Sequence, residues 1–92
     1  MNKPLFELGQ VVATPGALQA LEELGVQTQT LLARHTSGDW GDLGAEDKTE
    51  NQFALDKYLR IFSSYKLNDE TTIWVITEAD RSATTLLLPE DY

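Results

Sequence analysis

One group of residues in the last quarter of the chain combines the side-chain types that phosphate chemistry uses. Glu78, Asp80 and Arg81 stand close together, and Thr84 follows them. A guanidinium can bind a phosphate through paired hydrogen bonds, and a neighbouring carboxylate could act as a general base. The arginine would then stabilise the charge that develops on the phosphate oxygens. The same residues also suit a salt bridge that closes a turn, with the threonine present for its strand propensity, and we favour this structural explanation.

The single histidine is the second residue that could do chemistry. His35 precedes Asp39 by four positions, so the pair could form a base and its orienting group. With Glu78, Arg81 and Thr84 it would complete a candidate catalytic set. His35 also stands at the end of an expected helix, where it could instead bond the last carbonyls. The chain has no cysteine and no nucleotide-binding or serine-elbow motif, and we expect neither a cofactor nor a metal.

Carboxylates dominate the charge of the chain. Fifteen acidic residues face seven basic ones, which gives a formal net charge of −8, and the acids are densest between residues 39 and 50. Such a field repels phosphate backbones, so direct nucleic-acid binding is disfavoured and a basic protein partner is favoured. Solubility alone would also explain the charge. A magnesium site built from these carboxylates is an alternative to the ordinary explanation, which is a solvated helix start.

We expect binding residues in the acidic segment and on the strands that follow it. Arg60 stands one expected strand before Arg81, and the two could flank a small anion pocket. The candidate binding residues are Asp39, Trp40, Asp42, Glu46, Asp47, Arg60, Ser64, Tyr65, Asp80 and Arg81.

The first two thirds of the chain, which must position the candidate residues, carry mainly helix signals. Thr14 is a suitable N-cap before Pro15, and Gly25 ends the helix that they begin. Two further helices are expected over about 28–35 and 45–58, with a glycine-rich loop between them. The expected inner faces carry Ala17, Leu18, Leu21 and Leu24 in the first helix and Asn51, Ala54, Leu55 and Tyr58 in the third.

From Leu59 onward the apolar pattern changes from helical to alternating, which predicts strands. The run Ile73–Ile76 is apolar on both faces, as is typical of a central strand, and residues 8–14 favour an edge strand or an extended lead-in. We therefore expect one α+β domain over residues 1–92. About three N-terminal helices would pack on a three- to four-stranded antiparallel meander formed mainly by residues 59–89.

Several segments together resemble a family of small bacterial proteins that occur on plasmids and other mobile elements. Some of its members carry the label of plasmid-related or type I restriction-modification protein. The segments are Ala13–Leu21, Arg34–Leu43, Glu46 and Asp47 with Asn51, Ala54 and Leu55, Ser64 with Tyr65, and Trp74–Tyr92. The resemblance implies a mobile-element protein without implying an activity. The order of helices and sheet also resembles the barnase and RelE-type ribonucleases, which implies a metal-independent toxin as an alternative.

Taken together, these observations favour a non-enzymatic interaction or modulator protein over an enzyme. Its partner would be a basic protein, such as a nucleic-acid-binding host factor, which meets the acidic segment. The alternatives are the ribonuclease-like toxin and a small anion-binding domain. Because the chain lacks cysteine and an apolar leader, we expect a cytoplasmic protein without a membrane anchor.

Overall fold

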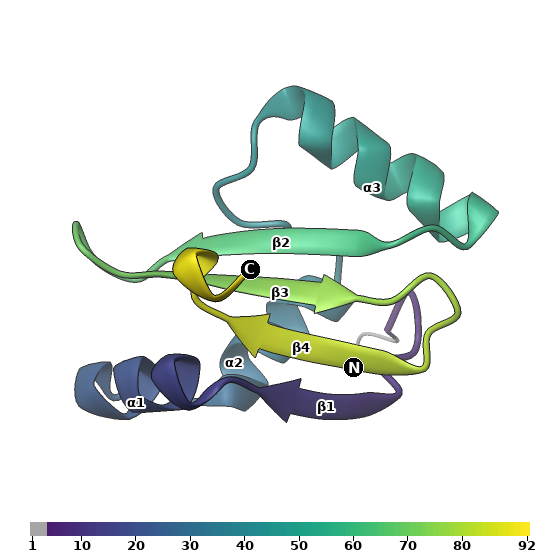
Figure 1. Cartoon of the computed structure of the whole chain (residues 1–92). Helices are drawn as coiled ribbons and strands as arrows, with labels where there is room; N and C mark the ends of the chain where they lie inside the picture. The colour runs from purple at the N-terminus through teal and green to yellow at the C-terminus, as the bar shows by residue number, and fades with distance from the viewer. Residues whose placement is uncertain (1–3) are drawn as a thin grey trace.

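A computed structural model describes residues 4–92, which form a four-stranded sheet with three α-helices and a final 3-10 turn (Figure 1). The fold is therefore α+β, as predicted. The elements are β1 (Gln10–Ala13), α1 (Pro15–Leu24), α2 (Thr28–Thr36), α3 (Ala45–Lys57), β2 (Ile61–Lys66), β3 (Thr72–Thr77), β4 (Ala83–Leu87) and η1 (Pro89–Asp91).

The sheet is mixed, with the strand order β1-β4-β3-β2. β2, β3 and β4 form the predicted antiparallel meander, but β1 joins β4 in parallel, so the prediction of a purely antiparallel sheet was wrong. Short hairpins force β2, β3 and β4 to alternate in direction, whereas the long helical connection leaves the direction of β1 open. The helices lie between β1 and β2 rather than ahead of the whole sheet.

The start and end of α1 follow the expected local signals. Thr14 Oγ1 accepts a hydrogen bond from the Ala17 amide at 3.2 Å, and Gly25 ends the helix in the left-handed region. Only Ala17 and Leu21 are buried, whereas Leu18 and Leu24, also expected on the inner face, are exposed. The helix touches the sheet along a narrow stripe.

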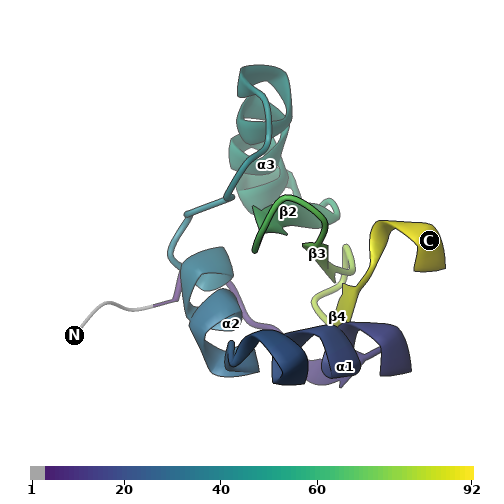
Figure 2. The ribbon, with the colours of Figure 1, turned by 90° about the vertical axis from the view of Figure 1, so that its left-hand side faces the viewer.

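Helices α1 and α2 cover one face of the sheet, and η1 lies on the other (Figure 2). The core between α1, α2 and the sheet takes alternate residues of the strands, among them Tyr65, Ile73, Val75 and Leu86. α3 lies beyond the β2 edge, where Ala54 packs with Trp40 and Ile61 in a smaller cluster. Tyr58, expected on the inner face of α3, instead follows its end with a φ of 54° and is exposed.

Hydrogen bonds close the outer edge of β2. The amide side chain of Asn51 donates to the Phe62 carbonyl at 2.6 Å and accepts from the Phe62 N–H at 3.1 Å. Farther along, the Asp42 N–H donates to the Ser64 carbonyl, and the Asp42 carboxylate accepts from the Lys66 N–H, both at 2.7 Å. These bonds use the backbone groups that an edge strand would otherwise offer to another chain.

Candidate functional site

His35 lies inside the protein, in a chain of hydrogen bonds that runs from α2 across the sheet. Its Nδ1 meets the Ser63 hydroxyl, and its Nε2 lies 3.0 Å from Thr77 Oγ1. Thr77 Oγ1 lies 2.7 Å from Thr84 Oγ1, which donates to the Leu8 carbonyl at 2.8 Å. The carbonyl can only accept, so the Thr84 hydroxyl proton points to Leu8, and Thr84 must accept its other hydrogen bond from Thr77. Thr77 therefore accepts from His35, which donates from Nε2. Nδ1 must then accept from Ser63.

This histidine chain is shielded from solvent. His35, Ser63, Thr77 and Thr84 all have relative exposures of 0%. Burial lowers the pKa of His35 to about 3, so the imidazole is neutral at physiological pH. Two of the predicted catalytic residues, His35 and Thr84, are therefore joined through Thr77, but in the interior, where a substrate does not reach them. The arrangement suits a brace that ties α2 and the segment around Leu8 to the sheet.

Arg81 is also turned inward. Nη1 donates to the carbonyls of Leu59 at 2.7 Å and Ala79 at 3.0 Å, and Nη2 donates to the carbonyl of Ala54 at 3.0 Å. Its own backbone has a φ of 61°, and the residue is only 9% exposed. The guanidinium thus joins the end of α3 to the β3–β4 turn. Backbone carbonyls occupy the fork that was expected to bind an anion or a carboxylate.

The other members of the predicted cluster point elsewhere. The carboxylate of Asp80 accepts from the Ser82 N–H at 3.0 Å within the turn. Glu78 lies 3.6 Å from Arg60, and Arg60 lines a hollow on the face that carries η1. Arg60 and Arg81 therefore do not flank one pocket.

Two aspartates of the acidic segment hold the loop between α2 and α3. Asp39 pairs with Arg34 at 2.6 Å, and this hydrogen bond lowers the pKa of the Asp39 carboxyl. The Asp39 carbonyl accepts from the Tyr65 hydroxyl at 2.7 Å. Asp42 binds the β2 edge through the Lys66 N–H. These expected binding residues are brought together, and their polar groups bond within the protein.

The remaining residues of the expected binding set divide between interior and surface. Trp40 is 4% exposed and packs beside Ile61, and Ser64 pairs with the loop backbone. Glu46 and Asp47 lie exposed in the first turn of α3, where the helix dipole favours their charge. They remain available to a partner.

A groove that the sequence did not reveal lies between α2 and the segment 4–9. The Leu5 N–H donates to the Thr36 carbonyl at 2.8 Å, which fixes one end of the segment to α2. At the other end Gly9 has a φ of +64° and lies so close to the Ser82 carbonyl that a side chain would not fit. The segment is therefore held at both ends and bridges the space beside α2.

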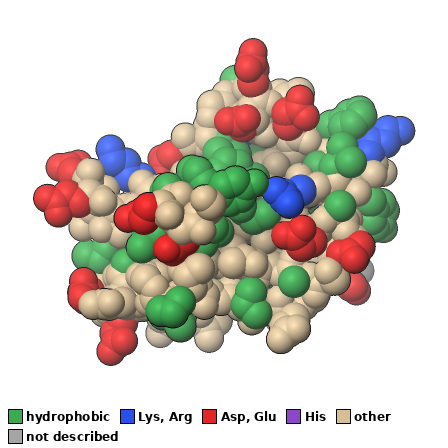
Figure 3. Space-filling model, viewed as in Figure 1, with side chains coloured by type: hydrophobic (Ala, Val, Ile, Leu, Met, Phe, Trp, Pro, Cys, Tyr) green, Lys and Arg blue, Asp and Glu red, His purple; other side chains and the backbone are tan. Residues whose placement is uncertain are grey.

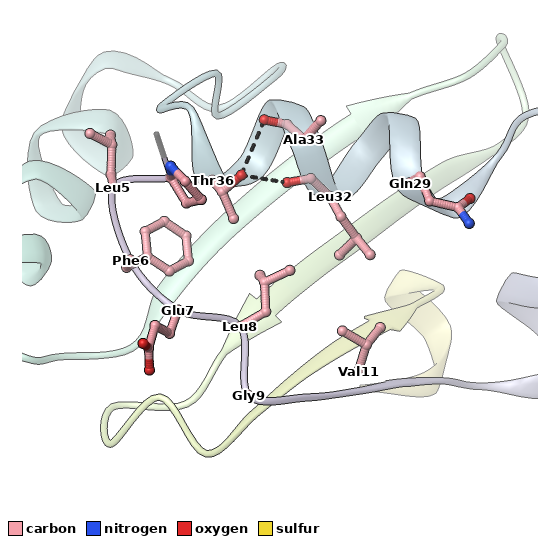
Figure 4. A pocket seen from close by; sticks show the side chains of 11 residues that line it. Leu5, Phe6, Glu7, Leu8, Gly9, Val11, Gln29, Leu32, Ala33 and Thr36 are labelled. Atoms are coloured by element: carbon pink, nitrogen blue, oxygen red, sulfur yellow. Dashed lines mark hydrogen bonds between the residues drawn. The ribbon is translucent and has the colours of Figure 1, made fainter. Parts of the chain in front are cut away.

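The groove has a volume of about 860 Å³ and is lined mainly by apolar side chains (Figure 4). Leu8 and Val11 lie along one side of it and Leu32 along the other, and Glu7 lies near one end. The lining residues are Pro4, Leu5, Phe6, Glu7, Leu8, Gly9, Val11, Gln29, Leu32, Ala33 and Thr36. No motif marks them, and the only sequence signal is an uncharged apolar pair, Val11 and Val12, in an expected edge strand.

The outer edge of β1 borders this groove and is open. The N–H groups of Gln10 and Thr14 donate to the carbonyls of Ser82 and Leu86 in and before β4, so those of Val11 and Ala13 point away from the sheet. Within residues 4–92 no hydrogen bond reaches these outward groups. The strand carries no charge and exposes Val11 and Val12. It therefore has none of the protection that closes β2.

Comparisons of the chain with protein-family models, curated proteins and solved structures gave no match. In the described part of the chain, no three His, Asp or Glu side chains lie close enough to share a metal ion. No helix of residues 4–92 has both the length and the apolar character needed to cross a membrane. The open β1 edge and its groove are the candidate functional site that this geometry favours.

Proposed function

We propose that this protein is a non-catalytic binding module that takes up an extended segment of a partner protein along β1. The observation that carries the proposal is the outward backbone of Val11 and Ala13, which no hydrogen bond from residues 4–92 reaches, beside an apolar groove. An exposed sheet edge is a template for one more strand, and peptide-binding domains use strand addition in this way.

The groove would supply the sequence preference of the added strand. Val11 is the parallel partner of Thr84, so its side chain lies on the face that α2 covers. Alternate side chains of an added strand would project to that same face and enter the groove beside Leu8 and Leu32. The backbone bonds would give affinity, and apolar residues at alternate positions would give selectivity.

Charge favours a basic partner over a second copy of this chain. Each copy carries a formal charge of −8, so two copies repel one another, whereas basic residues beside the bound segment are attracted. Glu7 lies at the rim of the groove, and Glu46 and Asp47 add to the field from α3. We therefore keep the hypothesis of a basic protein partner and propose that this partner binds along β1. That the protein belongs to a mobile element remains a prediction, which rests on the resemblance to the plasmid-protein family.

The ribonuclease alternative has less support from the geometry. His35 and Arg81 would have to abandon internal hydrogen bonds before either could meet a phosphate. RNA cleavage that persists in EDTA would restore this alternative.

Selection of random ten-residue peptides on the immobilised protein tests the proposal. We expect enriched peptides with apolar residues at alternate positions and lysine or arginine beside them. Two matched variants then locate the site, because Val11 and Val12 are 42% and 41% exposed but point to opposite faces of β1. Val11→Asp should weaken peptide binding by at least about tenfold, since a carboxylate would enter an apolar groove. Val12→Asp should leave binding unchanged.

A third variant tests the backbone contribution. Val11→Pro removes an N–H that points away from the sheet, so the fold should persist while strand addition is lost. The far-ultraviolet circular dichroism spectrum of each variant checks the fold. Equal losses in Val11→Asp and Val12→Asp, or selected peptides without alternation, would contradict strand addition at this edge.

A further inference from the structure

A second hollow lies on the sheet face that α1 and α2 leave uncovered. Figure 3 shows hydrophobic side chains gathered near the centre of this face beside a basic one, with carboxylates around them. The hollow has a volume of about 300 Å³ and is lined by Arg60, Phe62, Trp74, Ile76 and Tyr92. It lies on the face opposite the α2 groove and does not depend on the proposed strand addition.

Strand register brings the aromatic side chains together. Phe62 pairs with Ile76 and Ser64 with Trp74, so Phe62, Ile76 and Trp74 share this face. The rings of Phe62 and Trp74 meet edge to face with centroids 5.0 Å apart, and Tyr92 meets Trp74 at 5.8 Å. Such clusters accept a further flat ring, because aromatic pairs favour edge and offset contacts.

The C-terminal turn η1 holds Tyr92 over the sheet. Thr14 Oγ1 donates to Asp91 Oδ2 at 2.7 Å, and the Leu88 N–H donates to the same oxygen at 3.1 Å. The carboxylate of Asp91 therefore fastens the turn to the start of α1, and one wall of the hollow is set by a bond to another element.

Arg60 supplies a cation at the rim. Its Nη1 donates to the Tyr92 hydroxyl at 3.0 Å, and its Nη2 lies 3.6 Å from the Glu78 carboxylate. Both members of this ion pair are about half exposed, with side-chain exposures of 51% and 45%, so the pair is weak. The guanidinium has more N–H donors than these contacts use and can bind a second anion.

We propose that the aromatic hollow binds a small planar compound that joins an aromatic ring to an anionic group. A volume near the lower end for ligand pockets, about 300 Å³, suits one or two fused rings. The ring would pack against Trp74 and Tyr92, and the anionic group would bind Arg60. Since the net charge of −8 repels anions, selectivity for a negative group must come from this local cation.

Nitrogen-15 NMR of the intact protein tests this assignment with 2-naphthoate as the probe. The two tryptophans give two indole N–H signals, and Trp40, which is buried elsewhere, serves as an internal control. We expect saturable shifts of the Trp74 indole and of the Phe62 and Ile76 amides, with the Trp40 signal unmoved. The uncharged analogue 2-naphthamide should bind at least about tenfold more weakly, because it lacks the charge-assisted hydrogen bond. Acetate, which lacks the ring, should not bind.

Variants separate the contribution of the Arg60 charge from that of the aromatic contacts. Arg60→Gln should reduce naphthoate binding to the level of naphthamide, and Tyr92→Ala should weaken both compounds. Tyr58→Ala is the matched control, because Tyr58 is comparably exposed but lies outside the hollow. Val11→Asp should leave naphthoate binding unchanged, so this test and the peptide test can fail separately. Absence of a saturable Trp74 shift, equal binding of naphthoate and naphthamide, or an equal loss in Tyr58→Ala would overturn the proposal.

Discussion

Acidification should destabilise this protein through one buried side chain, the imidazole of His35. Burial lowers the pKa of the imidazole from 6.5 to about 3 in the folded state. Between these two values the unfolded chain binds a proton that the folded chain does not. Stability from this group is therefore complete above pH 6.5 and is lost as the pH falls toward 3.

The size of the loss follows from the same two pKa values. Each pH unit within that interval is worth about 1.4 kcal/mol. A change from pH 7 to pH 4.5 should therefore lower the free energy of unfolding by about 3 kcal/mol through His35 alone. Because the sequence contains one histidine, no other imidazole contributes.

Urea unfolding of the wild type and of His35→Gln at both pH values measures the effect. Glutamine does not titrate and satisfies the hydroxyls of Ser63 and Thr77 incompletely, so we expect a cost of about 2 kcal/mol at pH 7. Carboxylates titrate in both proteins, and their contribution cancels in the difference. At pH 4.5 the wild type should have lost this advantage, and the variant should be at least as stable as the wild type. An unchanged difference between wild type and variant at the two pH values would refute the assignment of a neutral, desolvated imidazole.

Two further predictions concern hydrogen bonds that hold the edges of the fold, and urea unfolding at pH 7 measures both. Asn51→Ala should cost about 2 kcal/mol, because it removes both bonds to Phe62, while Glu50→Ala on the exposed side of the same helix should change little. Arg81→Lys should cost about 3 kcal/mol, because an ammonium does not reproduce the fork that reaches several carbonyls. Equal stability of Arg81→Lys and wild type would contradict the inference that the Arg81 guanidinium stabilises the fold by joining α3 to the β3–β4 turn.

Local signals were sufficient for much of the fold. The Thr14 cap and Gly25 fix α1 within its own residues, and the alternating pattern after Leu59 predicted β2 correctly. The direction of β1 was not predictable in this way, because it depends on the pairing of Val11 with Thr84, far along the chain. Distant pairings leave little trace in a short segment.

The chemistry of the candidate residues was harder to predict than their secondary structure. Arg81 has the right charge for an anion site, but its partners are carbonyls such as that of Ala54, and every residue type carries a carbonyl. The sequence pattern therefore did not indicate that backbone carbonyls would bind the Arg81 guanidinium. The groove beside β1 arises from the path of the segment 4–9 over α2, and neither partner carries a distinctive motif.

The unequal edges of the sheet also set a limit on self-assembly. Fibril growth by strand addition needs two available edges on every molecule, one that receives a strand and one that receives the next. Asn51 and Asp42 occupy the second edge, so a molecule that has gained a strand at β1 offers no further site for growth. Association through β1 is thus monovalent and ends after one step, which lets an apolar edge stay exposed without seeding filaments.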